Sequence, residues 1–257
     1  MKSKILYGLI GYPLSHSFSQ KYFTEKFAKE GLVGYSYKNF PITNISELQN
    51  LLKQQPDLRG FNVTIPYKKQ IMPYIDEMDA VAERTGAVNT VQVMRNGKDI
   101  YLKGYNTDVY GFSRSLDEWF TTNGAELPVR ALVLGTGGAA KAAVYALSRF
   151  NMAVHSVSRC EGANVYKTYD RLDAADIADH PLIVNTTPLG MYPNAGECPA
   201  IPYQYLTEKH WLYDLIYNPE ETLFMRKGLE QGASVRNGGR MLHLQADKAW
   251  KIWNSYE

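Results

Sequence analysis

The chain has 257 residues, of which 45% are hydrophobic, and 28 basic residues stand against 26 acidic ones for a net charge of +2. These values exclude an intrinsically disordered chain and a strongly basic nucleic-acid-binding surface. No apolar run reaches membrane-spanning length, and Cys160 and Cys198 have no metal-site spacing. We therefore expect a cytoplasmic protein without metal, membrane or nucleic-acid partners, long enough for one large domain or two modest ones.

The first part of the chain is predicted to mix strands and helices. Residues 5–10 form a nearly continuous apolar run, and "YSYKNF" at 35–40 has the composition of a second strand. Asn44 and Glu47 have the spacing of a capping box, and the apolar residues after them recur at helical spacing. "RNGK" at 95–98 separates two strand-like runs, which predicts an antiparallel hairpin.

The stretch "GFNVTIPYKKQ" at 60–70 predicts a strand that stops abruptly. Val63 and Ile65 alternate with polar residues, and Pro66 then forbids further ladder pairing. Lys68 and Lys69 follow directly. Neighbouring residues face different directions on either a strand or a helix, so at most one of these lysines is expected to face a site.

The second part of the chain has a regular alternation of strands and helices. Asp108 is expected to open a helix with one apolar face, and "ALVLG" at 131–135 begins a strand, glycine turn and helix. The runs "AVHSV", "LIVNTT" and "WLYDLIY" read as further strands, and 242–253 as a last helix. This alternation predicts a parallel, doubly wound sheet.

"GTGGAAKAA" fits the dinucleotide-binding pattern G-x-G-x-x-A at Gly135, Gly137 and Ala140. The glycines permit a tight turn and a close approach of backbone amides to a pyrophosphate, and the helix N-terminus adds partial positive charge. The alternative is an ordinary glycine-rich turn between a strand and a helix. We favour nucleotide binding because the strand–turn–helix context is also met.

The next strand ends in Ser158 and Arg159, where an NAD-specific site usually carries Asp or Glu. A carboxylate would repel a ribose 2′-phosphate, whereas a guanidinium can bind one. The sequence therefore favours NADP over NAD. The alternative is that Arg159 is simply a solvated residue at a strand end.

Polar residues gather at predicted strand ends and turns of the first part. They are Ser15, Ser17, Asn62, Thr64, Lys68, Asn89, Asn106 and Asp108. Neutral donors and acceptors with one lysine and one carboxylate suit a small substrate with several hydroxyl groups. Each residue alone also has an ordinary structural explanation as a cap or turn residue.

These stretches also carry a family resemblance. The chain resembles the shikimate dehydrogenases in "GYPLSHSFS", "GFNVTIPYKK", "GAVNT", "NTDVYG", "GTGGAAKA", "NTTPLGM", "DLIYNP" and "GGRMLHLQA", in the family's order. The resemblance implies two α/β domains. Residues 1–105 with 238–257 would form the substrate domain, to which the C-terminal helix returns, and 106–237 the Rossmann-type NADP domain. It implies reversible NADPH-dependent reduction of 3-dehydroshikimate to shikimate, in aromatic amino-acid biosynthesis.

The resemblance also implies roles for individual residues. Lys68 and Asp108 would be catalytic. The substrate would be bound by Ser15, Ser17, Thr64, Asn89, Asp108, Tyr217 and Gln245. The cofactor would be bound by Gly135, Gly137, Gly138, Ala139, Ser158, Arg159, Thr187, Gly238 and Met241.

Lys68 has a chemical reason to be the functional lysine, because ketone reduction places negative charge on the carbonyl oxygen. A protonated lysine beside that oxygen stabilises the transition state or donates the proton. Lys69 is then expected to be solvated.

The sequence departs from the family pattern after Arg159, where Cys160 replaces a usual threonine. Glu161-Gly162-Ala163 also lacks the basic residue often found there. This departure weakens the expectation of strict NADP use.

Two alternatives stay open: a quinate/shikimate dehydrogenase that uses NAD, and a non-catalytic NADP-binding sensor on the same fold. The expected oligomeric state is monomer or homodimer.

Overall fold

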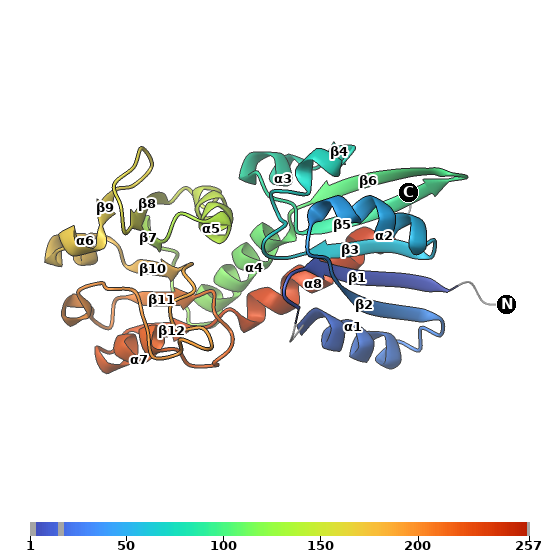
Figure 1. The fold of residues 1–257 in the computed structure, drawn as a ribbon. Coiled ribbons are helices and arrows are strands. Elements are labelled where there is room, and N and C mark those ends of the chain that lie inside the picture. Colours follow the sequence, from blue (N-terminus) through green and yellow to red (C-terminus); the bar gives the residue numbers. More distant parts are fainter. Residues whose placement is uncertain (1–3, 15–17, 256–257) are drawn as a thin grey trace. The chain divides into compact units, whose positions relative to one another are not determined.

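The chain folds into two units, seen in a computed structural model that describes residues 4–14 and 18–255 (Figure 1). The first unit comprises the described residues of 1–107 and 246–257, and the second comprises residues 108–245. In the described part of the chain, each unit is built on a six-stranded sheet. The last helix begins in the second unit and ends in the first.

The sheet of the first unit has the order β2-β1-β3-β5-β6-β4. Its strands are β1 (Ile5–Gly11), β2 (Tyr35–Pro41), β3 (Leu58–Val63), β4 (Glu77–Met78), β5 (Thr90–Asn96) and β6 (Asp99–Tyr105). Strand β1 runs parallel to β2 and β3, whereas β5 and β6 form the predicted antiparallel hairpin. Strand β3 ends at Val63, before Pro66, so Ile65, which the sequence analysis placed in the strand, lies beyond it and is exposed.

Alternation along β1 separates two apolar layers in the first unit. Leu6 and Ile10 pack into a core with α2 (Leu48–Gln54). Tyr7 and Leu9, on the opposite face, pack with α1 (Phe18–Lys29) and the end of α8 (Gly239–Asn254). The remaining helical segments are α3 (Ala80–Thr85), η1 (Ile45–Glu47) and η2 (Met72–Tyr74). The predicted capping box at Asn44 and Glu47 is confirmed, although it caps η1, which leads into α2.

The sheet of the second unit is parallel at every pairing among the described residues, in the order β12-β11-β10-β7-β8-β9. The strands are β7 (Arg130–Leu134), β8 (Ala153–Ser158), β9 (Lys167–Thr168), β10 (Leu182–Asn185), β11 (Trp211–Asp214) and β12 (Ser234–Arg236). The helical segments are α4 (Thr107–Thr122), α5 (Gly138–Ser148), α6 (Ala174–Asp179), α7 (Leu223–Glu230), η3 (Tyr169–Arg171) and η4 (Tyr203–Tyr205). The prediction of a parallel doubly wound sheet is confirmed.

Several element boundaries differ from the sequence prediction. Helix α4 begins at Thr107, so Asp108 lies in its first turn instead of opening it. Strand β11 ends at Asp214 and does not continue through Tyr217, because the Asp214 carboxylate accepts a hydrogen bond from the Ile216 amide and turns the chain. In the described part of the chain, no helix combines the length and apolar character needed to cross a membrane.

Candidate active site

The end of β3 and the loop after it bring three predicted residues of the first unit together. The Thr64 amide donates to the Ile10 carbonyl (2.9 Å) and so follows the end of β1. The Val63 amide donates to the Asn89 carbonyl (2.8 Å), and the Val88 amide donates to the Lys68 carbonyl (2.8 Å). The loop that carries Lys68 is therefore fixed against the segment that carries Asn89.

The two lysines differ in exposure, as the sequence predicted. Lys68 is half-buried, whereas its neighbour Lys69 is exposed. Ser15 and Ser17, which the resemblance assigns to the substrate, lie outside the described residues.

A buried polar network lies behind this loop. The Thr107 amide donates to Asn89 Oδ1 (2.7 Å), and Asn89 Nδ2 donates to Thr107 Oγ1 (3.0 Å). Asn62 Nδ2 donates to Thr90 Oγ1 (3.1 Å), and the Tyr37 hydroxyl donates to Asn62 Oδ1 (2.8 Å). Burial raises the pKa of Tyr37 and keeps its hydroxyl a donor. Because unpaired polar groups are costly in the interior, these bonds hold the strand ends in one arrangement.

The glycine turn of the second unit leaves open space at a helix start. Gly135 has φ of +110°, a conformation that favours glycine, and its amide donates to the Val157 carbonyl (2.8 Å). A Cβ at Gly137 or Gly138 would meet no atom within 4 Å, and Gly137 gives α5 no side-chain cap. Gly138 and Ala139 are exposed in the first turn of α5. Open space beside the start of a helix suits the pyrophosphate of a dinucleotide.

Ser158 and Arg159 follow at the carboxyl end of β8. Ser158 is half-buried and Arg159 is exposed, and Arg159 makes no ion pair among the described residues. Burial raises the pKa of Tyr169 to about 12, and the positive charge of Arg159 opposes that rise. The guanidinium therefore lies near Tyr169 and is open to a phosphate. The turn and this strand end fit NADP.

A second buried network surrounds Asp214, a fully buried carboxylate at the end of β11. Its Oδ1 accepts from Asn185 Nδ2 (3.0 Å) and the Ile216 amide (3.0 Å), and its Oδ2 accepts from the Thr222 hydroxyl (2.6 Å). Burial is the main reason that the pKa of Asp214 rises to about 6, and these three hydrogen bonds limit the rise.

Three residues that the sequence analysis assigned to substrate or cofactor binding lie next to the Asp214 network. Thr187 donates through its amide (3.0 Å) and its hydroxyl (2.7 Å) to Asn185 Oδ1. Tyr217 follows Ile216 directly, is 43% exposed, and has its pKa raised by burial. The Gly238 amide donates to the Ile216 carbonyl (2.9 Å), and a Cβ there would overlap the Leu215 carbonyl.

The remaining predicted residues lie on α4 and α8. Asp108 is half-buried. Gln245 is buried and donates to the Leu242 carbonyl (2.9 Å). Met241 is half-buried, and its carbonyl lies so close to Gly111 that any side chain at 111 would collide with it.

Sequence reasoning did not single out Asp214 or Asn185. Asp214 stands in the quoted "DLIYNP", where a carboxylate directly follows an apolar strand, and that placement was a signal. The hydrogen bond from Asn185 to Asp214 joins residues 29 positions apart, so it has no counterpart in local sequence.

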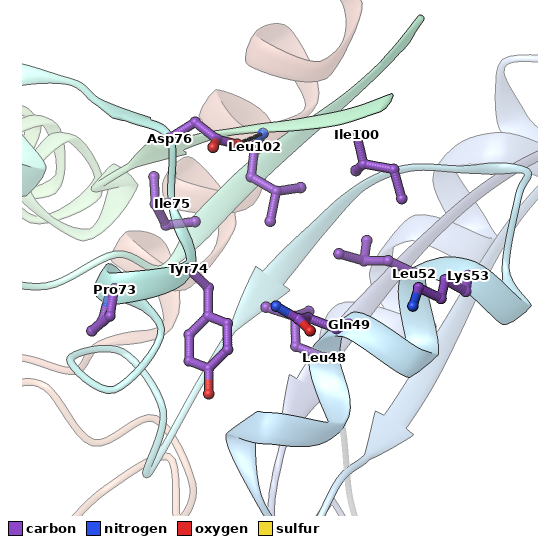
Figure 2. Close-up of a pocket in the computed structure, with 10 residues that line it drawn as sticks. All are labelled: Leu48, Gln49, Leu52, Lys53, Pro73, Tyr74, Ile75, Asp76, Ile100 and Leu102. Carbon is purple, nitrogen blue, oxygen red and sulfur yellow. Dashed lines mark hydrogen bonds between the residues drawn. The ribbon is translucent and has the colours of Figure 1, made fainter. Parts of the chain in front are cut away.

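A cavity of about 450 Å³ in the first unit contains none of the predicted residues (Figure 2). Its walls are α2, the segment around η2, and β6, lined by Leu48, Gln49, Leu52, Lys53, Pro73, Tyr74, Ile75, Asp76, Ile100 and Leu102. Asp76, the acidic residue of the lining, is already occupied as acceptor for the Leu102 amide (2.7 Å). The cavity is therefore distinct from the candidate site.

A parallel sheet with an open glycine turn at a helix start is the architecture of the dinucleotide-binding α/β proteins. The family model described as the shikimate dehydrogenase substrate binding domain matches residues 9–91. The chain is 37% identical to the shikimate dehydrogenase (NADP(+)) of Methanococcus maripaludis, over 98% of this chain and 91% of the relative. This chain belongs to the shikimate dehydrogenase family.

Solved structures agree with the sequence comparison. A shikimate dehydrogenase crystallised with NADP+ is 32% identical, has a TM-score of 0.85, and is matched over 99% of this chain and 91% of that one. A quinate dehydrogenase from Corynebacterium glutamicum, crystallised with NAD, is 28% identical with a TM-score of 0.81, over 99% and 95% of the two chains.

Proposed function

We propose that this protein is an NADP-dependent shikimate dehydrogenase that reversibly reduces 3-dehydroshikimate to shikimate in aromatic amino-acid biosynthesis. The observation that carries the proposal is the open glycine turn at the start of α5, followed one strand later by the exposed Arg159, in a chain of this family. A carboxylate in place of Arg159 would have favoured NAD.

The two units take different ligands in this proposal. The substrate domain is residues 1–105 with 238–257, and the NADP domain is residues 106–237. The turn at Gly135, Gly137, Gly138 and Ala139 would hold the pyrophosphate, and Ser158 with Arg159 the adenosine phosphate. Thr187, Gly238 and Met241 would lie by the nicotinamide.

The substrate is a ring with a carboxylate and several hydroxyl groups, and the assigned side chains match those groups. Ser15 and Ser17 would bind the carboxylate. The hydroxyl groups would be bound by Thr64, Asn89, Asp108, Tyr217 and Gln245. Asn89 is held by its bonds to Thr107, so its position is set before substrate arrives.

In this proposal the chain's own residues act by stabilising the charge that develops during the reaction. NADPH held at the glycine turn would supply the hydride that adds to the carbonyl carbon. Lys68 places an ammonium group beside the carbonyl oxygen, where negative charge develops, and Asp108 is the second catalytic group. The fixed backbone at Lys68 limits the reorganisation that this role requires.

We expect Lys68→Met to lower kcat by about three orders of magnitude while shikimate affinity changes by less than about threefold. The measurement is the NADPH absorbance with shikimate as substrate, together with shikimate binding by calorimetry. Lys69→Met is the matched control and should retain nearly full turnover, because Lys69 is exposed. Unchanged turnover in Lys68→Met would remove this lysine from catalysis, and no turnover in the unaltered protein would favour the sensor.

A quinate dehydrogenase using NAD is the second candidate, because a structure of that activity shares this fold. Steady-state rates with shikimate and quinate against both cofactors separate the two candidates. A higher kcat/KM with NAD+ would overturn the assignment of Arg159. We also propose that the enzyme is cytoplasmic, acts as a monomer or homodimer, and has no nucleic-acid partner.

A further inference from the structure

The short strand β9 brings a second basic residue to the carboxyl end of β8. The two strands pair in parallel with Val157 opposite Lys167 and Ser158 opposite Thr168, an offset of ten residues. Tyr169 and Arg171 follow β9 directly in η3, so the pairing of β9 with β8 brings this turn close to the end of β8. Arg171 Nη1 lies 3.0 Å from Glu161 Oε1, and the positive charge of Arg159 acts on the Tyr169 hydroxyl.

The local sequence therefore does not show all the charged side chains that lie at the end of β8. Arg159 and Glu161 alone would give one positive and one negative group where the ribose 2′-substituent is selected. The structure adds Arg171 from η3, which pairs with Glu161 and neutralises it, while Arg159 and the exposed Asp170 make no ion pair among the described residues.

We propose that the Glu161–Arg171 ion pair sets how strongly this enzyme prefers NADP to NAD, with Arg171 neutralising a carboxylate that would otherwise repel the 2′-phosphate. The proposal rests on the proposed function, since it concerns the same cofactor site. It assigns a specificity role to Arg171, a residue twelve positions beyond Arg159 in the chain.

The exposure of the Glu161–Arg171 ion pair determines how strongly it can change the affinity for NADP+. The two side chains are 64% and 79% exposed, so water and salt weaken their interaction with a nearby phosphate. One uncompensated charge near the surface then changes affinity for a doubly charged phosphate by about three- to fivefold at low salt. NAD+, which has no 2′-phosphate, should be nearly unaffected.

The test is the ratio of the Kd for NAD+ to the Kd for NADP+, measured by calorimetry at low salt. We expect Arg171→Gln to lower this ratio about three- to fivefold and Glu161→Gln to raise it by a similar factor. The double variant should return close to the unaltered protein, because both opposing charges are gone. Binding of 2′,5′-ADP, the half of NADP+ that carries the phosphate, should follow the same order without any turnover.

Arg226→Gln is the matched control. Arg226 also pairs with an exposed glutamate, Glu221 (3.5 Å), but it lies on α7, which packs on β11 and β12 at the other end of the sheet. The ratio of the Kd for NAD+ to the Kd for NADP+ should therefore be the same in Arg226→Gln as in the unaltered protein. If Arg171→Gln and Glu161→Gln both still bind NADP+ and both keep the Kd ratio of the unaltered protein, the inference is overturned. Loss of 2′,5′-ADP binding in the unaltered protein would instead overturn the cofactor assignment itself.

Discussion

At the scale of single residues, Asp214 shows how a buried charge organises loops that local sequence leaves undefined. Its carboxylate accepts three hydrogen bonds, from Asn185, Ile216 and Thr222. These donors come from the ends of β10 and β11 and from the start of α7. A buried carboxylate without such donors would be far less stable, so the three segments are held together by one group.

The raised pKa of Asp214 predicts a pH dependence of stability with a definite sign. The folded-state value is about 6 against an ordinary 3.8, so the contribution is fully present below pH 3.8 and is lost as pH rises through about 6. Asp214→Asn removes this titration. We expect the free energy of unfolding of the unaltered protein to fall relative to that variant by on the order of 2 kcal/mol between pH 4 and pH 7.

Urea unfolding followed by circular dichroism across that range measures the difference. Other titrating groups are common to both proteins and cancel in the comparison. A difference that stays constant with pH would show that Asp214 is ionised equally in the folded and unfolded states.

At the scale of elements, Trp253 is a main contact between the end of α8 and the first sheet. Trp253 is fully buried, stacks on Tyr7 with ring centroids 4.7 Å apart, and donates from Nε1 to the Val91 carbonyl (2.9 Å). The indole lies directly over Gly60 of β3, where any Cβ would overlap the ring. The absence of a side chain at position 60 is therefore what allows α8 to pack here.

We expect Gly60→Ala to destabilise the protein by about 2–3 kcal/mol, because the added methyl must displace a buried indole. Thermal or urea unfolding measures the loss. Gly196→Ala is the control: a Cβ there meets no atom within 4 Å, so stability should change little. Equal stability of the two variants would mean that the Trp253 ring moves aside at no cost.

Periodic elements were predictable from sequence, and elements fixed by tertiary contacts were not. The hairpin at Asn96–Gly97 and the glycine turn before α5 each carry a local signal, and both were predicted. Strand β9 has two residues and no periodicity, so nothing local marks it. The end of β11 was placed too late, because the Asp214 carboxylate that accepts from the Ile216 amide and turns the chain is itself held by Asn185, 29 positions away, and by Thr222.

The same distinction applies to the candidate site. Residues within motifs, such as Lys68 and Gly137, could be assigned to a site from sequence because each motif is local. The ion pair of Arg171 with Glu161 could not be predicted, because it depends on the pairing of β8 with β9. Register is set by side-chain packing across the sheet, which a single sequence does not state.

At the scale of the whole molecule, each unit has its own sheet and apolar core, which predicts separate responses to the two ligands. A bound ligand slows amide hydrogen exchange where it excludes water and accepts hydrogen bonds. NADP+ alone should protect residues 135–141 and 158–171 of the second unit. Shikimate alone should protect residues 62–68 and 85–91 of the first.

Hydrogen exchange followed by mass spectrometry resolves these segments. Arg171→Gln should weaken NADP+ protection at 158–171 while shikimate protection at 62–68 stays unchanged, because that substitution lies outside the first unit. Shikimate protection confined to residues 135–171 would contradict the assignment of substrate to the first unit. Because each ligand is tested alone, this result would leave the assignment of NADP+ to the second unit unaffected.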